Sequence, residues 1–492
     1  MKSTRQLFYL SLALSCLLMP LFSVASPPDK GLGVNLTHLK SYSSSIPFVD
    51  AFKKARPWFS TSDPGELNIT SDGWIASLQP GQVARTMIFN NVNGNYPTGV
   101  YNIFYQGEGE LKLGGGATAI SRGKGHIKAR VVSHKGGIKI QIRRTNPKNP
   151  IKNIRVILPG YEDSYLERPF YPPFIEYIQK FKVVRFMDWM QTNGSKVSTW
   201  DERTKKNHAV QTQKSGVAPE WIISLANTAK VNPWITIPHR ADDNYVKELA
   251  KLFKQNLDPQ LKVYLEYSNE VWNSTFPQSK YAKSHGRALS VKKKYSHLAF
   301  YSKRSVEVFD IWSEVFEGNN RLVRILAGQS SNAHSGEMIL KYGDAYKKAD
   351  AYAVAPYISL GRDFDRNNVD PDYLLSILNK RLETFVREKI KGSAKMATNY
   401  GLPIIAYEGG QHVEGRAKSG KFRCTAVNRH PGMEQLYTEY LETWNSESEN
   451  GLFVHFNDAS TPSQWGCWGM KEWLEQPVEQ APKFRAILRL ME

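Results

Sequence analysis

Apolar runs alternate with amphipathic stretches along most of this chain. An apolar run at 31–36 predicts a strand, and apolar residues at helical spacing over 46–58 predict a helix after it. After residue 159, seven more apolar runs alternate with helical stretches. The runs lie at 181–189, 231–239, 261–270, 321–329, 349–357, 402–410 and 451–458. The clearest helical stretches lie at 218–230, 242–256, 290–316, 372–395, 432–446 and 482–491.

Eight near-continuous apolar strands with helices between them indicate a parallel sheet. Eight such units predict an α/β fold, a (β/α)8 TIM barrel. A doubly wound open sheet is the alternative. The chain has no Gly-rich dinucleotide or phosphate loop at a strand end, and this counts against the open sheet.

The pattern differs between residues 59 and 158, where short β-rich runs are separated by Gly, Asn and Pro. Several runs alternate along one face, as in Ile138, Ile140 and Ile142. This pattern predicts a β-sandwich inserted between barrel strands one and two. The expected domains are a first strand and helix over 26–58, the inserted sandwich over 59–158, and the remaining barrel over 159–492.

The composition excludes disorder and leaves the partner open. Of the 492 residues, 41% are hydrophobic and 12% aromatic, which is enough for a large core. The 65 Lys and Arg exceed the 46 Asp and Glu and give a formal charge of +19. Such a surface favours acidic polymers, or it belongs to an exported protein that is simply basic. Because the basic residues form no tail or arm, we expect no nucleic-acid partner.

The first 25 residues have the pattern of a secretory signal peptide. A basic start is followed by an apolar run and the small-residue site Ser23-Val24-Ala25, so we expect cleavage before Ser26 and a secreted or periplasmic protein. An uncleaved anchor is the alternative, although Pro20 interrupts the run. Cys16 suggests a lipoprotein, but the residues before it fit a lipid-attachment site poorly. Removal of the segment takes away Lys2 and Arg5 and lowers the charge from +19 to +17.

Two cysteines remain after that cleavage, Cys424 and Cys467. In an oxidising compartment they predict one disulfide, with two free thiols as the alternative. They fall in the loops after strands seven and eight, which are neighbours in a closed barrel. No Cys/His cluster has metal-ligand spacing, so we expect no metal site and no cofactor. No other segment is apolar enough for stable membrane insertion.

The chemistry of such barrels sits where strands end in loops. The predicted strand ends carry Arg185, Asp188, Trp189, His239, Asn269, Glu270, Trp272, Gln329, Asn332, Tyr357, Glu408, His455, Asn457 and Asp458, with Trp465 and Trp468 following. Glu270 and Glu408 follow strands four and seven directly. Cleavage of a glycosidic bond needs two carboxyl groups in one site, one protonated and one ionised.

Two motifs carry a resemblance to a known superfamily. "EYSNEVWN" (266–273) resembles the Asn-Glu signature at strand four of the clan A, or 4/7, glycoside hydrolases. "PIIAYEGG" (403–410) resembles their strand-seven nucleophile segment. The resemblance covers the barrel and not the predicted sandwich. It implies a retaining β-glycosidase and does not specify the sugar.

The resemblance also implies roles for single residues. Glu270 would be the general acid/base and Glu408 the nucleophile. Asn269 would bind the sugar 2-hydroxyl, Arg185 would keep the nucleophile ionised, and Tyr357 would lie beside it. The chain departs from the family at strand eight, where many members end in a Trp that forms the sugar platform and this chain reads "FVHFND".

Other residues enter the predicted site on weaker patterns. The tryptophans Trp189, Trp200, Trp272, Trp465 and Trp468 are expected in loops on the active face, either under sugar rings or in the core. Asp188 is a further candidate for substrate binding. His239 is a sugar ligand or a structural histidine. Glu266 is expected to be a structural ion-pair partner.

These observations predict a secreted, monomeric, endo-acting retaining glycosidase whose partner is a polysaccharide or an oligosaccharide. A non-catalytic carbohydrate-binding barrel and a basic binder of acidic polysaccharide are the alternatives. A Ser-His-Asp hydrolase is disfavoured, because the chain has no Gly-x-Ser-x-Gly motif.

Overall fold

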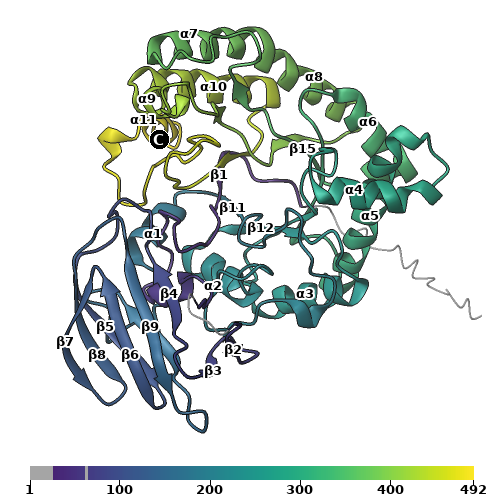
Figure 1. The fold of residues 1–492 in the computed structure, drawn as a ribbon. Helices are drawn as coiled ribbons and strands as arrows, with labels where there is room; N and C mark the ends of the chain where they lie inside the picture. The colour runs from purple at the N-terminus through teal and green to yellow at the C-terminus, as the bar shows by residue number, and fades with distance from the viewer. Residues whose placement is uncertain (1–25, 61–64) are drawn as a thin grey trace, which may run out of the picture.

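The computed structural model describes residues 26–60 and 65–492, so the predicted signal peptide and Cys16 lie outside the described residues. Within this part, eight parallel strands form a closed barrel (Figure 1). In barrel order they are β1 (Leu32–Asn35), β11 (Val183–Arg185), β12 (Asn232–Ile237), β13 (Val263–Tyr267), β14 (Leu322–Ala327), β15 (Ala351–Val354), β17 (Ile404–Ala406) and β19 (Phe453–Phe456). The barrel prediction is confirmed, and the open-sheet alternative is wrong.

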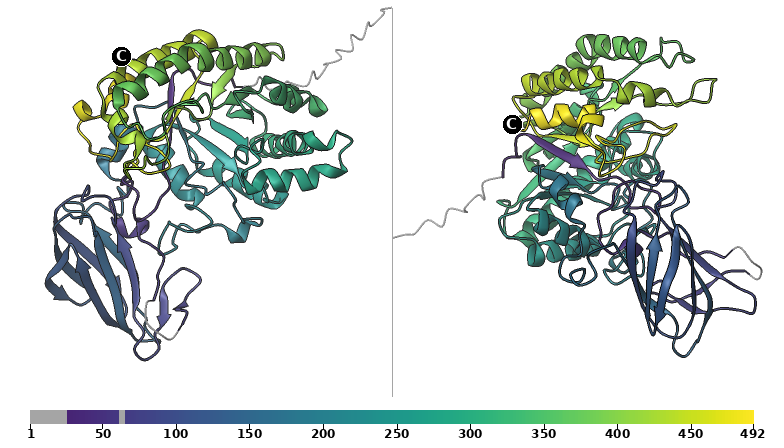
Figure 2. Two further views of the ribbon diagram at one scale, coloured as in Figure 1. Left: turned by 45° about the horizontal axis from the view of Figure 1, so that its top comes forward. Right: turned by 90° about the vertical axis from the view of Figure 1, so that its left-hand side faces the viewer.

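Helices surround the barrel (Figure 2). They are α1 (Pro172–Ile178), α2 (Pro219–Ala229), α3 (Asp243–Asn256), α4 (Pro277–His285), α5 (Ser296–Phe316), α6 (Ala333–Lys341), α7 (Pro371–Arg381), α8 (Arg387–Thr398), α9 (Arg423–Arg429), α10 (Gly432–Ser448) and α11 (Pro482–Arg489). Several pack directly on the barrel, as α2 does on β12, α5 on β13 and α8 on β17, while α9 and α11 pack on other helices. In α3, Leu249 and Phe253 are buried one turn apart, and the Asp242 side chain caps the first turn by accepting from the Tyr245 N–H at 2.7 Å.

The helix expected over 46–58 is wrong. Only a short 3-10 helix, η1 (Ala51–Lys54), forms there. The residues before it are extended, and the Val49 N–H donates to the Pro169 carbonyl at 3.0 Å instead of to a helical partner. Almost every side chain of this stretch is buried, so the apolar spacing reflects burial on several sides rather than one helical stripe.

The β-rich segment lies between β1 and β11 in the chain and projects from one side of the barrel (Figure 2). One antiparallel sheet has the order β10 (Lys152–Ile157), β5 (Gly99–Gln106), β8 (His126–Val131), β7 (Ala117–Gly123). A second has the order β4 (Ala84–Ile88), β9 (Ile138–Thr145), β6 (Gly109–Gly115). A small third sheet pairs β2 (Asn68–Ile69) with β3 (Ile75–Ser77). On β9, Ile138, Ile140 and Ile142 are buried together, as their alternation predicts.

The inside of the barrel is packed with side chains. Val183, Trp234, Tyr264, Ile325, Ala353, Tyr407 and Val454 are among the buried residues that form one cluster there. Two charged side chains, Arg185 and Glu266, are also almost fully buried, and β11 and β13 supply them. A polar network therefore begins within the barrel, above an apolar floor.

No helix in the part of the chain that the structure describes is long and apolar enough to cross a membrane.

Candidate active site

Arg185, the last residue of β11, organises the site. Its guanidinium is fully buried and donates five hydrogen bonds. Nε and Nη2 reach Glu266 Oε2 at 3.2 and 2.8 Å, and Nη1 reaches Glu408 Oε2 at 3.3 Å. The remaining two go to the side-chain oxygens of Asn35 at 3.1 Å and Asn269 at 2.9 Å. One cation thus joins two carboxylates and two amides from different strands or the loops that follow them.

Glu266 lies beneath the site and is an ion-pair partner, as predicted. Its carboxylate is 1% exposed and accepts from Arg185 and, at 2.9 Å, from the Trp234 indole N–H. Burial raises the pKa of Glu266, and the Arg185 charge opposes that shift. Because these neighbours enclose the carboxylate, Glu266 does not face a ligand. Its role is to hold the Arg185 guanidinium in place.

Glu270 is positioned by an unusual backbone after β13. Ser268 and Glu270 have φ values of 62° and 43°, in the left-handed region that few non-glycine residues adopt. The Glu270 carboxylate accepts from the Tyr407 hydroxyl at 2.9 Å and from the Asn273 amide at 3.0 Å. Burial raises the pKa of Glu270, and these two hydrogen bonds act in the opposite direction.

Glu408 follows β17 and is 7% exposed. Burial and the charge of Glu270 raise the pKa of Glu408 to about 8, while Arg185 lowers it. Arg185 favours the ionised form of Glu408, as expected, but burial and the charge of Glu270 outweigh its effect on the pKa. Two carboxyls that repel each other share one proton near neutral pH. A guanidinium contacts Glu408 and only neutral donors contact Glu270, so the geometry favours the charge on Glu408.

Asn269 is 2% exposed and is fixed on both sides of its amide. Its oxygen accepts from Arg185, and its nitrogen donates to the Asn193 side chain at 3.0 Å. Gln278 on α4 also donates to Asn193, at 2.7 Å. A primary amide has two N–H donors, so one donor of Asn269 stays available for a ligand.

Tyr357 lies next to the nucleophile candidate. Burial and the charge of Glu408 raise the pKa of Tyr357 well above its usual value, so the hydroxyl keeps its proton. The ring meets Phe456, the last residue of β19, edge-on with centroids 6.5 Å apart. Phe456 in turn meets Trp468 edge-on at 5.6 Å. Strand eight therefore ends in a Phe that packs between Tyr357 and Trp468, where many clan members have a Trp.

Asp188 is 3% exposed, and His38 holds it through an Nδ1–Oδ2 contact of 2.8 Å. The negative charge of Asp188 contributes to the raised pKa of Glu408, which places the two groups within electrostatic reach. His38 comes from the loop after β1, and sequence reasoning missed it.

The predicted tryptophans lie in different surroundings, some in the core and some at the surface. Trp189 is 2% exposed and stacks on Phe48 at 6.0 Å, so the structure places it in the core and not at the site. Trp200 packs edge-on against Tyr245 at 5.6 Å. Trp272 and Trp468 are half-buried, and Trp465 is 65% exposed.

His239 is 4% exposed and meets Tyr281 edge-on at 5.1 Å. Burial and the neighbouring Arg240 lower the pKa of His239 to about 4, so its imidazole is neutral at neutral pH. Its Nδ1 has no hydrogen-bond partner in the structure. A neutral ring nitrogen of this kind can accept or donate a hydrogen bond.

Sequence reasoning also missed Tyr407. The residue precedes Glu408 directly, and its ring lies inside the barrel, 5.1 Å from the Arg185 guanidinium. The alternation of a strand was the available signal, because Ile405 and Tyr407 have the same parity. Tyr407 links the two halves of the site, since it neighbours Glu408 in sequence and binds Glu270 in space.

Cys424 and Cys467 form the predicted disulfide. The bond ties the loop that carries Trp465 and Trp468 to α9.

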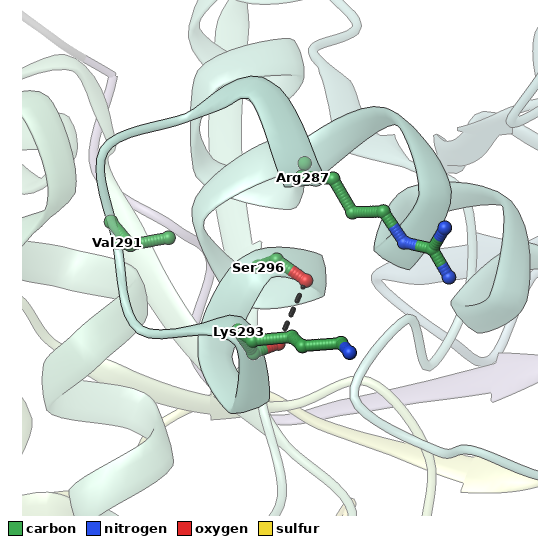
Figure 3. A pocket seen from close by; sticks show the side chains of 5 residues that line it. Arg287, Val291, Lys293 and Ser296 are labelled. Carbon is green, nitrogen blue, oxygen red and sulfur yellow. Dashed lines mark hydrogen bonds between the residues drawn. The ribbon is translucent and has the colours of Figure 1, made fainter.

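A separate pocket of about 320 Å³ lies in the connection from α4 to α5 (Figure 3). Gly286, Arg287, Val291, Lys293 and Ser296 line it. The Ser296 hydroxyl donates to the Lys293 carbonyl at 3.0 Å. None of the predicted site residues lines this pocket, and we assign no chemistry to it.

No protein-family model and no curated protein matches the chain. Solved structures do resemble it. A 4-O-α-L-rhamnosyl-β-D-glucuronidase from Fusarium oxysporum 12S has 15% identity and a TM-score of 0.41, over 68% of this chain and 66% of that one. A family GH51 arabinofuranosidase from Xanthomonas axonopodis pv. citri has 10% identity and a TM-score of 0.42, over 65% of each chain. The chain thus spans slightly less than two thirds of these two proteins.

A third structure, a xylanase mutant from Cellvibrio japonicus in complex with xylopentaose, has 9% identity and a TM-score of 0.38, over 89% of this chain and 97% of that one. Families GH10 and GH26 also occur among the similar structures. The solved structures that this chain resembles are thus clan A glycoside hydrolases, the group to which the two sequence motifs point.

Proposed function

We propose that this protein is a retaining β-glycoside hydrolase with Glu270 as general acid/base and Glu408 as nucleophile. The observation that carries the proposal is a shared network at the ends of β13 and β17. Arg185 binds Glu408 and Tyr407 binds Glu270. Burial raises the pKa of both carboxyls, and the charge of Glu270 raises the pKa of Glu408 further. A binding protein has no physical reason to bury two mutually repelling carboxyls at one barrel mouth.

In the first step, the ionised Glu408 attacks the anomeric carbon while Glu270 gives its proton to the leaving glycosidic oxygen. One C–O bond forms to the enzyme and one breaks to the aglycone. In the second step, Glu270 takes a proton from water, whose oxygen attacks the same carbon and releases Glu408. The anomeric configuration is therefore retained.

The surrounding side chains support this proton arrangement. As Glu408 loses its charge to the covalent bond, Glu270 no longer faces a neighbouring carboxylate, so its pKa falls and it becomes a base. The Tyr407 hydroxyl then stabilises the Glu270 carboxylate at the moment when it must be ionised. The free donor of Asn269 is available for the sugar hydroxyl next to the reacting carbon.

The wider proposal concerns location and architecture. We propose export through the segment 1–25 and action on a polysaccharide, with the two inserted sheets packed as a β-sandwich. Domain boundaries at 26–58, 59–158 and 159–492 belong to the same proposal. The two sheets each bury one face, as Ile127 and Ala129 on β8 and Ile138 and Ile140 on β9 illustrate, which supports this packing.

A panel of β-glucans, xylan, β-mannan, β-galactan and polygalacturonate with detection of new reducing ends tests the proposal. We expect hydrolysis of at least one neutral polymer, and loss of that activity in Glu270→Gln and Glu408→Gln. Hydrolysis that survives in either purified variant would refute the assignment of roles. Salt-sensitive binding to polygalacturonate without any hydrolysis would favour a binder of acidic polysaccharide instead.

A further inference from the structure

A cavity of about 560 Å³ lies at the end of β19, and neither of the proposed catalytic carboxyls lines it. Four separate parts of the chain line it. The loop after β1 supplies Thr37, His38, Tyr42, Ser43 and Ser44; the segment after β11 supplies Asp188; the end of β19 and the loop after it supply Phe456, Asn457, residues 459–463, Trp465, Gly466 and Trp468; and the inserted segment supplies Asn91. Figures 1 and 2 show the C-terminal loops, in yellow, next to the barrel-side end of the inserted sheets.

Two of the lining residues relate the cavity to Glu408. Asp188 lines it and acts electrostatically on Glu408. Phe456 lines it and packs against Tyr357, which borders Glu408. Glu408 itself stands behind these residues and does not line the cavity. In a retaining reaction the sugar that the nucleophile attacks belongs to the glycone, so this cavity lies where glycone units would continue.

Three buried polar atoms on the cavity's lining residues lack a hydrogen-bond partner. They are Ser43 Oγ, Ser44 Oγ and Asn457 Oδ1, on residues that are 9%, 2% and 3% exposed. Leaving a buried polar group unpaired costs about 1–3 kcal/mol, so native structures rarely keep several side by side. A ligand rich in hydroxyl groups would supply the missing partners.

Exposed aromatic rings gather at the same place. Among the described residues, the large exposed aromatics are Tyr42, Phe385 and Trp465, and two of these three line the cavity. A single exposed ring is ordinary, but exposed apolar side chains that gather at one cavity mark a binding surface. The apolar faces of pyranose rings are suitable partners for such side chains.

The lining carries almost no free charge. Its ionisable side chains are His38, Asp188 and Tyr42, and the first two are paired with each other at 2.8 Å. A uronic acid or a sulfated sugar would require an unpaired cation here, and the lining offers none. The cavity therefore fits neutral sugars, even though the whole chain is strongly basic.

Asn91 connects the inserted segment to this cavity. It lies between β4 and β5, with an exposed side chain and a φ of 61°. Its N–H donates to the Lys135 carbonyl at 2.8 Å, which fixes the loop to the connection between β8 and β9. The inserted segment thus fixes the backbone that carries this polar side chain at the edge of the cavity.

We propose that this cavity binds neutral pyranose units on the glycone side of the cleaved bond, with Trp465 as the main stacking surface and Asn91 as a contact from the inserted segment. The assignment of the cavity to the glycone side rests on the proposed function. The inference also gives the inserted segment a role in substrate binding. Ser43, Ser44 and Asn457 provide hydrogen bonds to the sugar hydroxyls.

Calorimetric titration of the full exported chain carrying Glu408→Gln tests the inference. The probes are cello-, laminari-, xylo- and mannohexaose, with tri-galacturonate as the acidic comparison. We expect at least one neutral hexaose to bind. Adding Trp465→Ala should weaken that binding about tenfold or more, since one anchoring aromatic carries a large share of an interface's affinity.

Asn91→Gly should weaken the same binding severalfold, and glycine keeps the left-handed backbone at this position. Phe385→Ala is the matched control, because it also removes an exposed aromatic ring but lies outside the cavity, and its affinity should equal that of the parent. Thermal melting of each variant shows whether it is folded. If Trp465→Ala is destabilised, Trp465→Phe serves as the second test. It keeps an aromatic face and should retain most of the affinity.

Absence of binding by every neutral hexaose, binding of tri-galacturonate alone, or equal affinity in the Trp465 and Asn91 variants would each overturn the inference. Failure of the proposed function gives a different result. A hexaose that binds through Trp465 but is never cleaved by the wild-type protein would refute the hydrolase and leave the cavity's role intact. Cleavage with an unchanged KM in both variants would refute the cavity's role alone.

Discussion

Replacing Arg185 by Met tests the electrostatic design of the site. The guanidinium is fully buried and donates five hydrogen bonds, and its loss leaves Glu266 and Glu408 without their cation. Removing one partner of a buried ion pair costs about 3–5 kcal/mol. Since Arg185 lowers the pKa of both carboxyls, the substitution raises both, and Glu408 is then protonated over more of the neutral range. We expect kcat/KM to fall by at least about 10²-fold at pH 7.

The sign of the pH dependence follows from the same groups. In the variant, the folded-state pKa values of Glu266 and Glu408 lie further above their unfolded values. A raised carboxyl pKa stabilises the fold at low pH, and that stability is lost as pH rises through the folded pKa. The loss of stability against the wild type should therefore be larger at pH 8 than at pH 5.

Urea unfolding at both pH values, together with a pH profile of kcat/KM, measures these effects. Arg185→Lys is the matched control, because it keeps the charge and loses the planar guanidinium. Its stability should lie between that of the wild type and that of Arg185→Met. A Met variant that is as stable at pH 8 as the wild type, with an unshifted pH profile, would refute the role given to Arg185.

Three further predictions follow from single contacts. Glu270→Gln and Glu408→Gln should each reduce turnover by several orders of magnitude and leave the melting temperature within a few degrees, by activity assay and calorimetry; near-normal turnover in either would refute its role. Tyr407→Phe removes the donor to Glu270, so the pKa of Glu270 should rise, the alkaline limb of the pH profile should move to higher pH, and kcat should fall about tenfold; an unmoved limb would mean that Tyr407 only packs. Reduction of the Cys424–Cys467 bond, which closes a loop with a sequence separation of 43, should cost about 3–4 kcal/mol in the chain-entropy model and should raise KM more than it lowers kcat; two alkylatable thiols in the unreduced, denatured protein would contradict the bond.

The sequence predicts the barrel well because its strands are buried on both faces. Each of the eight apolar runs contains an observed strand, since near-continuous apolar residues leave few alternatives. The stretch 46–58 was misread for a related reason. Its side chains are buried on several sides, so apolar residues fall at helical spacing without a helix.

The site was predicted in part. Glu270, Glu408, Arg185 and Asn269 come together because parallel strands bring their carboxyl ends to one edge of the barrel. Trp189 was misplaced, because a Trp at a strand end packs inward or outward depending on neighbours such as Phe48, which are distant in sequence. His38 and Asn91 were missed because they approach the site through loops whose paths no periodicity encodes.

The configuration of the first product tests the two-glutamate mechanism most directly. Proton NMR recorded in the first minutes of hydrolysis, on the neutral polysaccharide or oligosaccharide that the panel identifies, separates the two anomers before mutarotation mixes them. Attack by Glu408 followed by attack of water predicts that the β-anomer appears first. First appearance of the α-anomer would contradict a covalent intermediate at Glu408 and with it the central proposal.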